Sequence, residues 1–151
     1  MDSYFAFLQG YVQELEQMAG QEREKYAALV SYDHQRIDRA VSAQQAANMR
    51  LAQLENQRQQ EQRLAGLEGL TFQQILDRLE GAQRDRFSQL FTRFGRAVEE
   101  IRYYNGRALS FANEGLRILG GVAPGAQPGT YDAAGKRPGQ GGASPLFDAE
   151  V

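Results

Sequence analysis

The chain of 151 residues contains no cysteine, and none of its four prolines lies in residues 1–119. Without cysteine there is no disulfide framework, no thiol nucleophile and no cysteine-based metal site. Because proline breaks helices, its absence from residues 1–119 is compatible with long helices. All four prolines and eight of the 16 glycines lie in residues 120–151, a composition that neither holds a helix nor buries a core. We therefore expect a helical domain over residues 1–119 and a disordered, flexible Gly/Pro-rich tail over residues 120–151.

The chain also lacks an excess of basic charge and any long hydrophobic run. Its net charge is −2, which argues against a nucleic-acid-binding surface. No apolar stretch approaches the length needed to cross a membrane. The acidic, amphipathic start of the chain has neither the basic region nor the apolar core of a signal peptide. These features predict a cytoplasmic protein that does not insert into membranes.

Groups that could carry catalysis are few. His34 is the single histidine, and it follows a candidate helix cap, where a histidine is most often an exposed surface residue. Neighbouring acidic residues such as Glu22 and Glu24 are mostly one or two positions apart, so most of them do not share a helix face. There is no glycine-rich phosphate loop after a strand and no di-metal signature. We therefore predict a binding protein rather than an enzyme, with no cofactor and no metal.

Helical spacing divides residues 1–65 into two long helices. The first is predicted from Ser3 to Val30, with one apolar face that Glu22 interrupts. A break follows at residues 31–33, where the Asp33 carboxylate can cap the second helix. The second helix is predicted to run to about Ala65 and is rich in glutamine, so its seam should pack weakly.

Two more helices are predicted after Gly66 and Gly69. Thr71 and Gln74 have the spacing of a capping box, which predicts a short helix from Phe72 to Glu80. Gly81 then breaks or bends the chain, and residues 82–119 read as one long amphipathic helix. The predicted fold is therefore all-α: an elongated antiparallel helical hairpin or coiled-coil bundle of three long helices plus one short one.

The last long helix carries more apolar surface than a small bundle needs. Its main stripe reads as core and comprises Phe87, Leu90, Phe91, Phe94, Val98, Ile101, Ala108, Leu109, Ala112, Leu116 and Leu119. A second, narrower row lies beside it and consists of Tyr104, Phe111 and Ile118. Either this row also belongs to the core of the bundle, or it contacts a partner, because monomers rarely leave such a row exposed. The partner would be another protein or a second copy of the chain.

The tail contains two aromatic residues, Tyr131 and Phe147, and the segment around Tyr131 is the stronger candidate for a binding motif. Tyr131 stands within Thr130-Tyr131-Asp132-Ala133-Ala134-Gly135-Lys136, between stretches rich in glycine and proline. The segment is either a solubilising tail or a short linear motif whose anchor is Tyr131.

In this order of features the chain resembles the FlgN family of flagellar type III export chaperones. The matching segments are the turn at Ala28-Leu29-Val30-Ser31-Tyr32-Asp33, the short helix that begins Thr71-Phe72-Gln73-Gln74-Ile75-Leu76, the end of the long helix and the tail segment around Tyr131. The end of the long helix matches at Asn105, Leu109, Phe111 and Leu116. One departure is the second helix, which is richer in glutamine and alanine than expected of the family.

The resemblance implies a cytoplasmic chaperone for hook-associated proteins of the hook–filament junction. It implies that the chaperone binds the C-terminal segments of these clients, prevents their premature assembly and delivers them to the cytoplasmic domain of the export-gate membrane protein. The client-binding residues are then expected among Tyr104, Leu109, Phe111, Leu116 and Ile118. By position Tyr131 matches the tyrosine that docks at the gate, and Tyr104 is the alternative. Such a chaperone should be a monomer or weak homodimer, whereas the competing hypothesis is a self-associating coiled-coil scaffold or adaptor.

Overall fold

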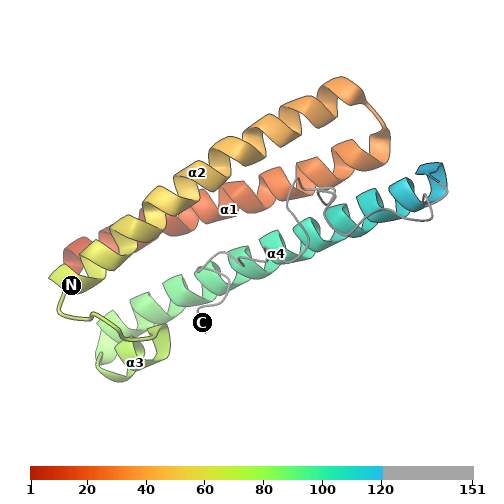
Figure 1. The fold of residues 1–151 in the computed structure, drawn as a ribbon. Coiled ribbons are helices and arrows are strands. Elements are labelled where there is room, and N and C mark those ends of the chain that lie inside the picture. Colours follow the sequence, from red (N-terminus) through yellow and green to blue (C-terminus); the bar gives the residue numbers. More distant parts are fainter. Residues whose placement is uncertain (121–151) are drawn as a thin grey trace.

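The computed structural model describes residues 1–120, which form four helices (Figure 1). They are α1 (Asp2–Ser31), α2 (His34–Leu64), α3 (Phe72–Asp77) and α4 (Gly81–Gly120). No described residue lies in a strand. The prediction of an elongated all-α protein with three long helices and one short one is therefore confirmed. The tail from residue 121 onward, which includes Tyr131, lies outside the described residues.

Helix α1 is the central element of the structure and lies between α2 and α4 (Figure 1). Helix α2 runs back along α1, and α4 then runs in the same direction as α1. The rings of Tyr4 and Phe87 lie 6.2 Å apart, and those of Tyr11 and Phe94 lie 5.5 Å apart. These contacts join residues in the same order along both helices, so α1 and α4 form a parallel pair. Helix α3 packs against the N-terminal part of α4.

A tight turn separates α1 from α2. Tyr32 adopts a left-handed conformation with φ of 56°, and its N–H donates to the Leu29 carbonyl oxygen. Asp33 then caps α2, because its carboxylate accepts a hydrogen bond from the Arg36 N–H at 3.1 Å. The predicted cap at Asp33 is thus confirmed.

The connection from α2 to α4 follows the local signals of the sequence. Gly66 and Gly69 have φ of 72° and 75°, which residues with a side chain rarely adopt. The capping box of Thr71 and Gln74 is present at the start of α3. Helix α3 ends at Asp77 rather than at Glu80, because the chain tightens into i→i+3 hydrogen bonds before Gly81 reverses its direction with φ of 55°.

The parallel pair of α1 and α4 has the seven-residue spacing of a coiled coil. The core seam of α1 alternates steps of four and three residues, and the seam of α4 does the same. The apolar part of the two seams is buried and consists of Tyr4, Leu8, Tyr11, Leu15 and Met18 of α1 and Phe87, Phe91, Phe94, Val98 and Ile101 of α4. Residues of α2, of α3 and of the connections before and after α3 complete this core, namely Leu51, Leu54, Leu67, Ile75 and Leu79.

The same seams become polar in their next layer. Glu22 and Lys25 occupy the next two seam positions of α1, and both are buried. Their side chains form an ion pair of 2.6 Å between Lys25 Nζ and Glu22 Oε2. Lys25 Nζ also donates to Asn105 Oδ1 of α4 at 3.1 Å. Because polar side chains in a coiled-coil seam need their own partners, this layer favours one register of α1 against α4.

Helix α2 is attached more weakly than α4. Its buried residues are only Ala40, Leu51, Leu54 and Gln62. Exposed ion pairs add to this contact: Glu14 accepts two hydrogen bonds of 2.7 Å from Arg50, and these lower the pKa of the Glu14 carboxyl. Such exposed pairs contribute little stability. The weak seam predicted for this helix is therefore confirmed.

The main stripe of α4 is core over only part of its length. Phe87 through Ala108 are buried as predicted, but Leu109, Leu116 and Leu119 are exposed. For Leu116 and Leu119 the reason is the length of α1, which ends at Ser31 while α4 continues to Gly120. The interpretation of these three leucines as core residues was wrong.

Candidate functional site

Exposed apolar side chains gather at the end of the molecule that holds the α1–α2 turn. We call this region, residues 22–45 with residues 102–119, the open end, and the region around α3 the closed end. Most of the large apolar residues exposed in the described part of the chain belong to the open end, namely Val30, Tyr32, Val41, Tyr103, Leu109, Leu116, Ile118 and Leu119. The residues buried there are the alanines Ala28, Ala40 and Ala108 and the ion pair of Glu22 with Lys25. The open end is therefore poor in apolar packing and rich in uncovered apolar surface.

Tyr104 lies at the edge of the contact between α1 and α4 and is half-buried. Its ring is 6.3 Å from the ring of Tyr26, and the guanidinium of Arg23 stands 5.5 Å from its centroid. Arg23 also forms an ion pair with Glu100 of α4. One face of the predicted binding residue Tyr104 is thus engaged within the protein.

Phe111 is also half-buried, and its cover comes from the hairpin turn. The rings of Phe111 and Tyr32 lie 5.9 Å apart. Tyr32 itself is 71 % exposed, so the two rings form a partly open aromatic step at the tip of the hairpin. The contact also shows how far α1 reaches along α4.

The remaining predicted residues lie at or beyond this step. Leu109 is just exposed, whereas Leu116 is 61 % and Ile118 is 71 % exposed. In Figure 1, the end of α4 projects past the turn between α1 and α2. The structure therefore brings the five predicted residues of α4 to one end of the molecule, with Tyr104 and Phe111 partly covered and Leu116 and Ile118 uncovered.

Two residues of this surface were not predicted as binding residues. Leu119, 86 % exposed, had been assigned to the core stripe. Tyr32 had been treated only as part of a turn. The signal available in the sequence was the seven-residue spacing. Leu29 and Tyr32 continue the α1 seam up to the break after that helix, whereas Leu119 continues the α4 seam past the level at which α1 ends.

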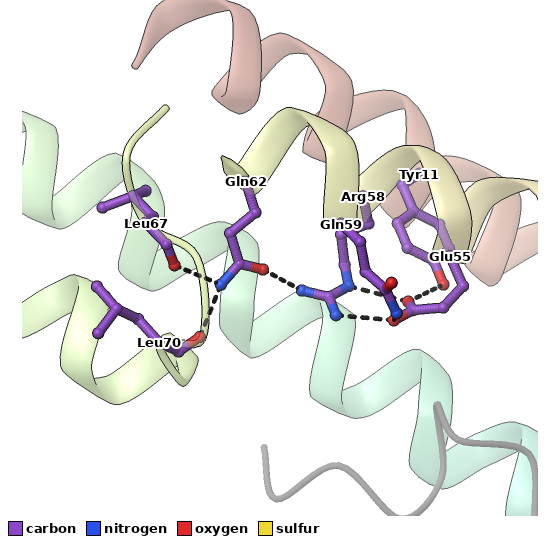
Figure 2. Close-up of polar contacts among 7 residues, drawn as sticks. All are labelled: Tyr11, Glu55, Arg58, Gln59, Gln62, Leu67 and Leu70. Atoms are coloured by element: carbon purple, nitrogen blue, oxygen red, sulfur yellow. Dashed lines mark hydrogen bonds and ion pairs between the residues drawn. The ribbon is translucent and has the colours of Figure 1, made fainter. Parts of the chain in front are cut away.

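The closed end carries a polar network in which the drawn side chains bond to one another and to backbone carbonyl oxygens (Figure 2). Arg58 donates to both carboxylate oxygens of Glu55 at 2.7 and 2.9 Å, and to Gln62 Oε1. The buried Gln62 amide in turn donates to the carbonyl oxygens of Leu67 and Leu70, at 2.8 Å each. The side chain of Gln62 therefore fastens the end of α2 to the loop that leads into α3.

Tyr11 joins this network to α1. Its hydroxyl lies 3.5 Å from Glu55 Oε2 (Figure 2). Burial raises the pKa of the Tyr11 phenol well above its ordinary value, and the neighbouring Glu55 carboxylate raises it further. The phenol is therefore protonated at neutral pH and acts as a hydrogen-bond donor between α1 and α2.

The two ends of the molecule thus differ in what they offer to another molecule. At the closed end, the polar groups in Figure 2 bond to one another around an apolar core. At the open end, the last two turns of α4 present leucine and isoleucine side chains next to the aromatic step. An uncovered apolar helix face of this kind is suited to packing against an amphipathic helix.

No protein-family model, no curated protein and no solved structure matches the chain. Among the helices of residues 1–120, none is both long and apolar enough to cross a membrane.

Proposed function

We propose that this protein is an export chaperone that binds the C-terminal segments of flagellar hook-associated proteins, prevents their premature assembly in the cytoplasm and delivers them to the export gate. The observation that supports client binding is the uncovered apolar end of α4, where Leu116 and Ile118 lie beside the half-buried Phe111. The resemblance to the FlgN family supports the identity of the clients. A client segment that becomes helical only in the assembled filament exposes apolar surface beforehand, and such a face of α4 is suited to cover it.

The proposal predicts that a charge on this face weakens client binding without unfolding the protein. Replacing Ile118 by aspartate places a carboxylate where the client's apolar side chains would pack, so we expect affinity for hook-associated C-terminal segments to fall by about tenfold or more, roughly 1.4 kcal/mol. Phe111→Ala should also weaken binding. Both variants should keep nearly all of their helix content. Isothermal titration calorimetry and circular dichroism measure the two quantities.

A matched control is Met49→Asp, which places the same charge on an exposed apolar residue of α2 away from the open end. Its affinity for the client segments should equal that of the unchanged chain. The proposal is wrong if the unchanged chain does not bind these segments. It is equally wrong if light scattering gives a stable oligomer whose size does not respond to them, which is the behaviour of a scaffold.

The delivery step is predicted to depend on residues 122–151, in which Tyr131 is the proposed gate-docking residue. Because the apolar core cluster ends at Ile101, we expect truncation after Gly121 to leave the helices folded and client binding largely intact. Secretion of the clients should fall strongly, and Tyr131→Ala in the full chain should reproduce much of that loss. Helix content, client affinity and the amount of secreted client are the three measurements. Loss of client binding on truncation would refute this division of roles.

A further inference from the structure

The contact between α1 and α4 changes character at the layer formed by Glu22, Lys25 and Asn105. On the side of the closed end, the apolar core cluster reaches as far as Ala19 and Ile101. In the layer itself, Lys25 Nζ is held by the Glu22 carboxylate at 2.6 Å and by Asn105 Oδ1 at 3.1 Å. Because a buried ammonium that loses one of its partners is penalised, this layer holds α4 to α1 at Asn105.

The part of α4 that follows this layer is held only weakly to the rest of the protein. We call residues 106–120 the arm. Over residues 106–119, Ala108 alone is buried. The ring of Phe111 lies 5.9 Å from that of Tyr32, but Tyr32 is 71 % exposed. Separating the arm from α1 therefore exposes little additional apolar surface, and its cost in free energy is small.

The turn between α1 and α2, beside which the arm lies, is joined within itself. Arg36 donates to both carboxylate oxygens of Glu24, at 2.6 and 3.0 Å. The Asp33 N–H donates to Ser31 Oγ at 3.2 Å, and the Asp33 carboxylate caps α2. These contacts connect α1 to α2, and none of them involves the arm. The turn can therefore keep its shape when the arm moves away from it.

Gly106 is the position at which α4 can bend. It directly follows Asn105, so it lies at the junction between the anchored part of α4 and the weakly held part. Glycine weakens the interior of a helix relative to alanine. No atom lies within 4 Å of the position that a Cβ on Gly106 would take, so packing does not require glycine there. A residue that bends easily next to an anchored one has the position of a hinge.

We propose that the arm is hinged: α4 bends at Gly106, and residues 107–120 swing as one helix between the position in the structure and an open position away from the α1–α2 turn. The layer of Glu22, Lys25 and Asn105 is the fixed end of this movement. Opening separates the rings of Tyr32 and Phe111 and uncovers apolar surface on both. The inference goes beyond the proposed function, because the movement belongs to the free protein and requires no client.

Distances between paired spin labels test the movement, and the absence of cysteine allows the labels to be placed in the full chain. His34→Cys with Asn113→Cys puts labels on exposed residues beside the turn and on the arm. Double electron–electron resonance should show two populations of distances for this pair, the longer one belonging to the open arm. The control pair is Gln13→Cys with Gln89→Cys, which joins exposed residues of α1 and α4 next to the apolar core and should give one narrow population.

Two substitutions in the labelled chain should shift the populations in opposite directions. Tyr32→Gly removes the ring contact with Phe111 and suits a φ of 56°, so the ratio of open to closed arm should rise by about fivefold. Gly106→Ala favours the straight helix, so the same ratio should fall by about fivefold. The control Gly10→Ala makes the same change at an exposed position of α1 and should leave the ratio unchanged.

Hydrogen exchange distinguishes a hinge from fraying of the helix end. A bend at Gly106 breaks the helical hydrogen bonds next to it, so the amides of residues 107–110 should exchange faster than those of residues 111–115. Fraying would instead make protection decrease steadily towards Gly120.

Three results would each overturn the inference: a single distance population that Tyr32→Gly leaves unchanged, a ratio that Gly10→Ala alters as much as Gly106→Ala does, or steadily decreasing protection along the arm. All of these measurements use the free protein. A failure of hook-associated segments to bind would therefore refute the proposed function and leave the hinge standing, and the reverse holds as well.

Discussion

Replacing Leu15 by alanine is expected to lower the free energy of unfolding by about 3–4 kcal/mol, because a fully buried leucine loses its transfer energy and leaves a cavity. Leu15 is 0 % exposed and lies in the apolar part of the α1 seam, opposite the seam of α4. Urea denaturation of the full chain, followed by circular dichroism, measures the change.

The matched control is Leu116→Ala, which makes the same chemical change on α4 where the side chain is exposed. We expect its effect to stay within about 0.5 kcal/mol. A similar loss in both variants would mean that the apolar stripe of α4 is buried along its whole length, and it would remove the basis for a binding surface at the open end.

The second large effect is expected in the polar layer between α1 and α4. Lys25→Met keeps most of the aliphatic stem but leaves the carboxylate of Glu22 buried without its cation. Breaking a buried ion pair in this way costs about 3–5 kcal/mol, whereas replacing both partners by apolar residues is often neutral. We therefore expect Lys25→Met to be strongly destabilising and the double variant Glu22→Leu with Lys25→Met to recover most of the loss.

An exposed pair provides the comparison for this experiment. Arg63 and Glu68 form an ion pair of 3.1 Å whose side chains are both about two-thirds exposed. Arg63→Met should change the free energy of unfolding by less than about 1 kcal/mol. If Lys25→Met is no more harmful than Arg63→Met, the Glu22–Lys25 pair is solvated in solution and does not fix the register of the two helices.

These effects divide the molecule into a stable part and an accessible part. The apolar seam and the network around Gln62 hold the closed end together. Beyond the Glu22–Lys25 pair, the helices meet through alanines and half-buried rings. The proposed chaperone function would benefit from this division, because a binding surface at one end can remain open while the core at the other end maintains the fold.

Much of the fold follows from the sequence because its signals are local. The cap at Asp33, the capping box of Thr71 and Gln74 and the glycines of the α2–α3 connection each act within a few residues. The periodicity of apolar residues likewise predicted the long helices and the weak seam of α2. In each case, one stretch of backbone and its own side chains decide the outcome.

The candidate site could be predicted only in part. The row of Tyr104, Phe111 and Ile118 indicated that α4 has more apolar surface than a small bundle buries. However, spacing along one helix gives only the direction of each side chain and not the residues that contact it. It therefore could not distinguish Phe111, which Tyr32 partly covers, from Ile118, which is uncovered. Nor could it show that Leu116 and Leu119 lie past the end of α1.

The sequence by itself determined the helices, their boundaries within a few residues and the surplus of apolar surface on the last of them, because helix formation and capping depend on near neighbours. Only the tertiary structure decided which part of that surplus is core. The parallel register of α1 and α4 places Tyr32 beside Phe111. The apolar stripe is buried as far as Ala108, and its leucines past Phe111 are exposed because α4 is longer than the helix on which it packs.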